Sequence, residues 1–356
     1  MVKDEYYVIG VMSGTSLDGV DVAYLHFKYA NTWTYDIIYG ETIAYSPAWE
    51  QKLREAINYK TSELETLDVN YTVFLAEVIQ DFIAKFKLEK IDAVCSHGHT
   101  ILHQPEHGIT FQMGNLKKLS EVLQQTVVCD FRVQDVELGG QGAPLVPIGD
   151  ELLFSEFTYC LNLGGFSNIS TNDGNKRIAY DVCPVNIVLN HYMQQLGKSY
   201  DDGGQIASSG QVDVNLLKEL NALEFYQMNF PKSLGLEWVK ATIFPLIDKS
   251  KLPVADILRT FVEHCAIQIS KQFVSKGKVL ITGGGMYNSF LIDRIQSLSE
   301  HTIHMPDSKL IEFKEALIFG FLGVLKLRGD VNVLASVTGA QKNHSSGVVY
   351  FANNSN

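Results

Sequence analysis

The chain has 356 residues, and at about 150 residues per domain this length predicts two domains with a cleft between them. Hydrophobic residues make up 46% of the chain and charged residues 19%, which excludes disordered, collagen-like and coiled-coil proteins. Its formal net charge of -11 would repel a phosphate backbone or an anionic membrane surface, so we expect no nucleic acid and no membrane partner.

The cysteine pattern favours a reducing compartment. The chain has five cysteines and no Cys-x-x-Cys motif, which supports neither a disulfide framework nor a zinc knuckle. The apolar stretch 316–325 is too short to span a bilayer as a helix. We therefore expect a cytoplasmic protein with reduced thiols.

The first half predicts an alternation of strands and helices. Apolar runs predict a strand over 7–12, a small-residue turn over 13–19 and a returning strand over 20–27. Helical spacing follows over 47–57 and 67–86. Further strands are predicted over 91–95 and 126–130, with polar loop residues at 97–100 and a glycine- and proline-rich crossover over 138–147.

The second half opens on the same plan, with a strand over 159–163, a break over 164–168, and strands over 169–171 and 177–180. Helices over 213–223, 254–275 and 312–327 and a strand over 278–282 complete an alternating α/β order. The repeated opening predicts a duplicated α/β unit. We place the domains at 1–147 and 148–356, with the C-terminal helix able to pack back on the first.

Three small-residue turns are candidates for phosphate and nucleoside binding. The turn Gly14-Thr-Ser-Leu-Asp-Gly19 offers two glycines, two hydroxyls and a carboxylate, so backbone N–H groups could converge on a phosphate. The alternative is an ordinary polar hairpin turn without a binding role. The pair Gly164-Gly165 and the run Gly283-Gly-Gly285 could hold the other phosphate edge and the nucleoside. On this interpretation we expect Gly14→Val or Gly19→Val to weaken ATP binding while leaving the fold largely intact.

No P-loop fingerprint is present, and no Rossmann fingerprint follows the first strand. Phosphate turns in two related halves are instead the plan of the actin, hexokinase and Hsp70 superfamily. This analogy predicts an α/β protein with two related actin-like (ribonuclease H-like) domains around an interdomain ATP cleft.

The segment Val11-Met-Ser-Gly-Thr-Ser-Leu-Asp-Gly-Val-Asp21 resembles the signature of the anhydro-N-acetylmuramic acid kinase family, a branch of that superfamily. Further blocks that resemble the family follow in order through most of the chain. They are His97-Gly-His-Thr-Ile-Leu-His-Gln-Pro105, Thr110-Phe-Gln-Met-Gly-Asn115, Asp130-Phe-Arg-Val-Gln-Asp135, Gly139-Gly-Gln-Gly-Ala-Pro-Leu-Val-Pro147, Asn162-Leu-Gly-Gly165, Pro231-Lys-Ser233, Gly283-Gly-Gly285 with Asn288, and Val337-Thr-Gly-Ala340.

The resemblance implies an ATP-dependent kinase of cell-wall recycling that opens the 1,6-anhydro ring of 1,6-anhydro-N-acetylmuramic acid with water and phosphorylates O6. It implies Asp181 as the base that activates water, and His97, Thr100, Arg132 and Glu315 at the sugar. It also implies ATP and Mg2+ as cofactors, with Asp18 helping to hold the metal directly or through water, and a homodimer. The implied nucleotide residues are Gly14, Thr15, Ser16, Leu17, Asp18, Gly19, Val20, Asp21, Gly164, Gly165, Gly283, Gly284, Gly285 and Asn288.

Several of these residues have structural alternatives. Asp181, expected just after a strand, could be a turn or helix-capping aspartate, and Arg132 could be a partly buried ion pair with a neighbouring aspartate. Glu315 could be a first-turn acid of the last helix. His97, His99 and His103 have a metal-like spacing without a completing ligand, so a sugar-facing loop with one buried histidine is the favoured interpretation.

The chain also departs from the family pattern. Asp181-Val-Cys-Pro-Val-Asn186 stands where the family usually carries Asp-Thr-Gly-Pro-Gly-Asn, His99 where glutamine is common, and Asn190 where aspartate is usual. Backbone freedom beside Asp181 is reduced. Two rival functions therefore stay open: a kinase for another anhydro-sugar, and a catalytically weak nucleotide-binding regulatory protein. The role of Cys183 is open as well.

Overall fold

The computed structural model describes residues 3–14 and 17–352, and its contacts divide the chain into two compact units. The first unit combines residues 1–153 with 313–356, and the second comprises 154–312. Residues 148–153 and the C-terminal segment therefore cluster with the first half of the chain, a different division from the one at 147/148. Thr15 and Ser16 of the predicted phosphate turn lie outside the described residues.

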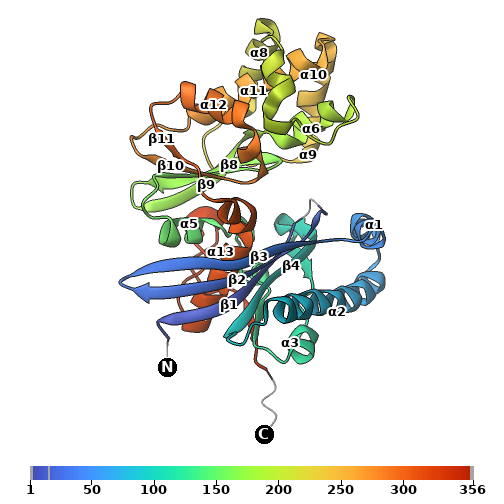
Figure 1. The fold of residues 1–356 in the computed structure, drawn as a ribbon, viewed down its shortest axis with the longest axis vertical. Coiled ribbons are helices and arrows are strands. Elements are labelled where there is room, and N and C mark those ends of the chain that lie inside the picture. The colour runs from blue at the N-terminus through green and yellow to red at the C-terminus, as the bar shows by residue number, and fades with distance from the viewer. Residues whose placement is uncertain (1–2, 15–16, 353–356) are drawn as a thin grey trace. The chain divides into compact units, whose positions relative to one another are not determined.

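The first unit is a mixed sheet with helices on both faces (Figure 1). Its strands are β1 (Glu5–Ser13), β2 (Gly19–Ala30), β3 (Thr32–Ala44), β4 (Ala93–Gln104), β5 (Ile109–Met113), β6 (Val127–Cys129) and β12 (Val348–Tyr350). Its helices are α1 (Pro47–Glu55), α2 (Thr61–Phe86), α3 (Lys118–Leu123), α4 (Val133–Glu137), α5 (Pro147–Leu153), α14 (Ala335–Thr338) and most of α13 (Ser308–Arg328).

The second unit also has one sheet with helices packed against it. Its strands are β7 (Tyr159–Leu163), β8 (Phe166–Asp173), β9 (Lys176–Pro184), β10 (Lys278–Thr282) and β11 (Thr302–His304). Its helices are α6 (Asn186–Gln194), α7 (Gln205–Ser209), α8 (Val214–Asn221), α9 (Leu236–Trp238), α10 (Phe244–Ser250), α11 (Val254–Ser270) and α12 (Ser289–Ser297).

The two sheets repeat one strand order. In the first sheet the order runs β3-β2-β1-β4-β6, with β1, β2 and β3 antiparallel and β4 and β6 parallel to β1. In the second sheet β9-β8-β7-β10-β11 has the same order and the same strand directions. The duplicated α/β unit that the sequence predicts is thereby confirmed.

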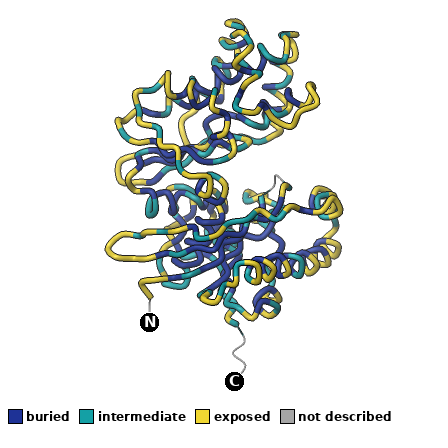
Figure 2. The backbone as a smooth tube through the Cα atoms, viewed as in Figure 1, coloured by how far each residue is buried: buried dark blue, intermediate teal, exposed yellow. Residues whose placement is uncertain are grey.

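Each sheet is held by its own apolar core, and the central strands are buried along most of their length (Figure 2). In the first unit α2 packs on one face of the sheet, in the cluster that includes Ile9 and Val11. Phe321 of α13 packs against Phe27 of β2, with the two ring centroids 5.3 Å apart. The apolar stretch 316–325 is thus part of the core of the first unit.

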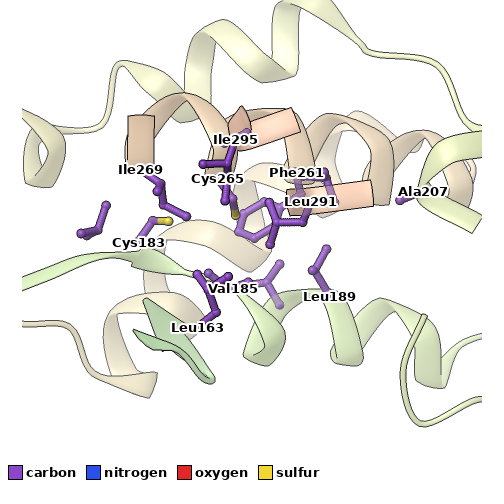
Figure 3. Close-up of a cluster of buried hydrophobic side chains, with 14 of the residues drawn as sticks. Leu163, Cys183, Val185, Leu189, Ala207, Phe261, Cys265, Ile269, Leu291 and Ile295 are labelled. Atoms are coloured by element: carbon purple, nitrogen blue, oxygen red, sulfur yellow. The ribbon is translucent and has the colours of Figure 1, made fainter. Parts of the chain in front are cut away.

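The core of the second unit lies between α6, α11, α12 and the sheet. Phe261, Cys265 and Ile269 of α11 gather with Cys183 and Val185 at the end of β9 (Figure 3). Cys183 and Cys265 are free thiols with no exposed surface, and burial raises the pKa of Cys265 well above its ordinary value. Cys183 therefore has a packing role in this core.

Several predicted elements differ in extent. Helix α2 begins six residues earlier than expected, α11 ends at Ser270 and not at residue 275, and the polar residues 97–100 lie inside β4 and not in a loop. Over the part of the chain that the structure describes, no helix has the length and apolar character needed to cross a bilayer.

Candidate active site

The predicted phosphate turn joins β1 to β2, as expected. Leu17 has a φ of 62°, and its N–H donates to the Gly14 carbonyl at 3.4 Å, so the chain reverses tightly here. Asp18 is exposed at the end of the turn, and the Asp21 carboxylate accepts a 2.6 Å hydrogen bond from Thr42. The turn therefore presents a carboxylate beside the backbone that a phosphate would approach.

The fold leaves no room for a side chain at Gly19, the second glycine of this turn. A Cβ on Gly19 would lie 2.5 Å from the Ile43 carbonyl oxygen of β3, against the backbone of the paired strand. The expectation that Gly19→Val leaves the fold largely intact is therefore wrong, because the substitution would force β2 and β3 apart.

Gly14→Val is the informative substitution in the turn. A branched side chain next to the phosphate-binding backbone should weaken ATP binding at least tenfold, because phosphate must approach that backbone closely. Calorimetry with ATP on the folded variant measures this effect. Unchanged affinity in a variant that melts like the wild type would remove the turn from the nucleotide site.

Arg132 lies at the start of α4 and binds two buried acceptors. Its Nε donates to His97 Nε2 at 2.9 Å, and its Nη1 donates to the Gly142 carbonyl at 2.6 Å. Since His97 Nδ1 contacts the Gly98 carbonyl at 2.8 Å, the imidazole carries its proton on Nδ1 and is neutral. Burial, helped by the Arg132 charge, holds the pKa of His97 well below its ordinary value.

The alternative of an ion pair between Arg132 and a neighbouring aspartate is not found among the described residues. Asp135 is fully buried, and it accepts hydrogen bonds from the Gly142 N–H and from Thr338 Oγ1, both at 2.7 Å. Asp135 thus fixes the loop whose carbonyl holds Arg132. Burial lowers the pKa of Arg132 to about 10, and the charges of Glu315 and Asp135 oppose this shift.

Glu315 is an exposed residue of α13 whose charge interacts with that of Arg132. Helix α13 begins at Ser308, but Phe313 has a non-helical backbone (φ -110°, ψ 15°) that kinks it, so Glu315 lies in the first turn of the part of the helix that follows the kink. The alternative of a first-turn acid therefore fits this position. The preceding residue, Lys314, is buried and pairs with Asp150 of α5 at 2.7 Å. This ion pair fixes the helix beside Glu315.

His97 and His99 point to different partners although they are two residues apart on β4. His97 packs on Phe319 of α13, with ring centroids 4.5 Å apart, whereas His99 Nδ1 lies 2.7 Å from Ser13 Oγ. Gly98 between them has a φ of 75°, which breaks the usual alternation of the strand. Both imidazoles are buried, so the expected loop with one buried histidine is wrong. The described residues hold no cluster of three metal-binding side chains.

Asp181 lies within β9, in the second unit. The backbone of the segment 231–234 runs beside it: the Asp181 N–H donates to the Lys232 carbonyl at 3.0 Å, and the Leu234 N–H donates to Asp181 Oδ2 at 2.7 Å. The following helix α6 has Val185 at its N-cap without a side-chain hydrogen bond, so the helix-capping alternative for Asp181 is wrong. Burial raises the pKa of Asp181, and the Leu234 N–H opposes this shift.

The second unit also contains the other two glycine turns. The Gly164 and Gly165 carbonyls accept hydrogen bonds from the N–H groups of residues 185–187 at the start of α6. A Cβ on Gly283, whose φ is 87°, would lie 2.5 Å from Asn162 Oδ1, whereas one on Gly284 would meet nothing within 4 Å. Asn288 caps α12, its Oδ1 accepting from the Leu291 N–H at 3.0 Å. Asn288 thus has a structural role in addition to any role at the nucleotide.

The structure brings the predicted residues together in two groups. His97, Arg132 and Glu315 gather in the first unit, which also holds the phosphate turn and Thr100; Asp181 and the remaining glycines lie in the second. A hollow of about 280 Å³ in the second unit, lined by residues such as Met193, Tyr200 and Gln205, includes none of them.

Four groups that hold these residues were not predicted. They are the Gly142 carbonyl at Arg132, the Leu234 N–H at Asp181, and the buried tyrosines that contact Ser13. Gly142 lies in the family-like block 139–147, and Leu234 directly follows the block 231–233. This position is the only sequence signal for these two residues.

A family model described as anhydro-N-acetylmuramic acid kinase matches residues 6–352. The chain belongs to this family. It is 33% identical to the anhydro-N-acetylmuramic acid kinase of Pseudomonas savastanoi pv. phaseolicola, across 97% of this chain and 99% of that protein. It is 34% identical to the enzyme of the same name from Pasteurella multocida, across 98% of both chains.

Among solved structures, component A of the Acidaminococcus fermentans (R)-2-hydroxyglutaryl-CoA dehydratase aligns with a TM-score of 0.47 at 12% identity, covering 90% of this chain and 98% of that one. Family membership and the repeated strand order confirm the α/β, actin-like fold class, and membership confirms an ATP-dependent sugar kinase.

Proposed function

We propose that this protein opens the 1,6-anhydro ring of 1,6-anhydro-N-acetylmuramic acid and phosphorylates O6 with ATP, with Asp181 as the general base. The family match over residues 6–352 supports the reaction, and the setting of Asp181 supports its role. Its Oδ2 is held by the Leu234 N–H, and burial brings its pKa closer to neutrality. A carboxylate that is fixed and less acidic than usual is suited to take a proton from water.

The reaction balances with this single base. Asp181 accepts a proton as the water oxygen bonds to C1, and the C1–O6 bond breaks with its electron pair left on O6. O6 then bonds to the γ-phosphorus of ATP, and ADP leaves. The products are N-acetylmuramic acid 6-phosphate, ADP and a proton, which Asp181 returns to solvent.

Arg132 is proposed to bind the sugar. The substrate that the family resemblance implies carries a lactyl carboxylate, and a guanidinium is a strong donor to such a group. Nε and Nη1 of Arg132 are fixed by His97 and Gly142, so the guanidinium plane is set before a ligand binds. Glu315 and Thr100 are assigned to the same sugar by the resemblance alone.

The nucleotide is proposed to bind at the three glycine turns, with residues 14–21 at the phosphates. Bound magnesium would neutralise charge on the phosphates of ATP. The exposed Asp18 carboxylate offers the hard oxygen ligand that this ion prefers, and one or two carboxylates plus phosphates usually suffice to hold it. Asp18 therefore fits a magnesium ligand, directly or through water.

We further propose a cytoplasmic homodimer that acts only on small molecules. Five free, buried cysteines suit a reducing compartment, and the net charge of -11 disfavours nucleic acid. Light scattering of the purified protein would measure the oligomeric state.

The reaction is tested by measuring ADP release from the purified protein with and without 1,6-anhydro-N-acetylmuramic acid, together with the product mass. We expect sugar-dependent ADP release and a product that has gained one water and one phosphate. Turnover only with another anhydro-sugar would identify a related kinase. ATP binding without turnover would point to a regulatory protein, and either result would contradict the proposal.

A further inference from the structure

Four buried polar side chains form a closed cluster beneath the phosphate turn. Ser13, the last residue of β1, places its Oγ 2.6 Å from the Tyr45 hydroxyl, 2.7 Å from His99 Nδ1 and 3.0 Å from the Tyr71 hydroxyl. The two tyrosine hydroxyls are 2.7 Å apart. None of the four residues is more than 5% exposed, so we name this set, Ser13, Tyr45, Tyr71 and His99, the turn-base cluster.

The protons of the turn-base cluster can be assigned by counting. Four contacts this short each need one proton, and the three hydroxyl groups supply only three. With Tyr71 donating to Ser13, Ser13 donates to Tyr45 and Tyr45 donates to Tyr71, which closes a ring. The fourth proton must therefore come from His99 Nδ1. Burial lowers the pKa of His99 to about 4, so the imidazole is neutral at pH 7 and donates only through Nδ1.

The cluster connects the turn to three other parts of the first unit. Ser13 lies directly ahead of Gly14, Tyr45 follows β3, Tyr71 belongs to α2 and His99 to β4. Burial raises the pKa of the Tyr45 hydroxyl, and the negative charges of Asp18 and Asp21, at the other end of the turn, add to this shift. The side chain of Ser13, where the turn begins, is thus held by hydrogen bonds that it shares with β4, α2 and the segment after β3.

We propose that His99 is a positioning residue for nucleotide binding, which acts by donating its Nδ1 proton to Ser13 and so fixing the entry to the phosphate turn. The proposal rests on the assignment of that turn to the ATP phosphates. Without the His99 donor, Ser13 Oγ keeps only one of its two accepted hydrogen bonds and loses its hydrogen bond to β4. The turn backbone would then have to be ordered when ATP binds, which weakens binding.

Two substitutions separate this role from mere packing. His99→Asn places a side-chain N–H close to the position of Nδ1 and keeps the donor, whereas His99→Leu fills similar space without one. We expect His99→Leu to weaken ATP binding in calorimetry about tenfold and to raise the KM for ATP equally, with the KM for the sugar within about twofold of wild type. We expect His99→Asn to restore ATP affinity to within about threefold of wild type.

The same titrations with Gly14→Val distinguish failure of this inference from failure of the turn assignment. Weakened ATP binding by Gly14→Val together with wild-type binding by His99→Leu would overturn the role of His99 and leave the turn assignment standing. Wild-type binding by Gly14→Val would overturn the turn assignment itself. A His99→Leu protein with a lower melting temperature and equal losses for both substrates would show that His99 only packs, and equally weak binding by His99→Asn would show that the donor is irrelevant.

Discussion

Replacing Asp181 by asparagine should lower kcat by roughly 10²–10⁴-fold while ATP affinity stays near the wild-type value. The asparagine keeps the size of the side chain, and its Oδ1 can still accept the 2.7 Å hydrogen bond from the Leu234 N–H. What it loses is the basic lone pair that takes the proton from water. Single-turnover assays of product formation, with ATP binding measured separately, give the two quantities.

Asp213→Asn is a matched control for this substitution. Asp213 also accepts a 2.7 Å hydrogen bond from a backbone N–H, that of Leu216, but it does so as the N-cap of α8. Since asparagine caps a helix about as well as aspartate, we expect Asp213→Asn to keep wild-type kcat. If Asp181→Asn behaved in the same way as this control, Asp181 would not be the base.

The pH profile gives an independent check on Asp181. A general base must be ionised, so kcat should fall as the pH falls through its pKa. Because burial raises the pKa of Asp181, this decline should begin at a higher pH than for an ordinary aspartate. The residual activity of Asp181→Asn should lack that acidic limb.

The sequence predicts the central strands of each sheet better than the strands at its edges. Apolar runs such as 7–12 and 278–282 belong to buried central strands, where burial imposes the pattern. The edge strand β3 is absent from the predicted elements. Only Ile37 in it is buried, and a register shift between Ile37 and Tyr39 interrupts the alternation of its apolar residues. Strand β5 is also absent from the predicted elements, because it is short and only Gln112 and Met113 in it are buried.

In the candidate site, too, some groups could be predicted from the sequence and others could not. The motif residues themselves could be named from the sequence, because glycines, carboxylates and the family blocks are visible there. Their partners could not be, since the Gly142 carbonyl and the Leu234 N–H are backbone groups that any residue type supplies. The spacing of His97 and His99 was misleading as well, because the positive φ of Gly98 turns the two imidazoles toward different partners.

Arg132→Ala should raise the KM for the sugar at least tenfold and leave the KM for ATP within about twofold of wild type, because a charge-assisted contact to the substrate carboxylate is lost. The substitution also leaves two buried acceptors, His97 Nε2 and the Gly142 carbonyl, without their hydrogen-bond donor. This loss should lower the free energy of unfolding by about 1–3 kcal/mol. Stability will therefore fall whether or not Arg132 binds sugar.

A control that lowers stability without removing the guanidinium separates these two effects. Thr338→Val deletes the hydrogen bond to Asp135, in the same loop network, and should lower the melting temperature while both KM values stay near wild type. Arg132→Lys keeps the charge but not the planar fork of donors, so its KM for the sugar should lie between those of wild type and Arg132→Ala. Steady-state kinetics and thermal unfolding of the three variants test this, and an Arg132→Ala enzyme that melts early with both KM values unchanged would assign Arg132 to the fold alone.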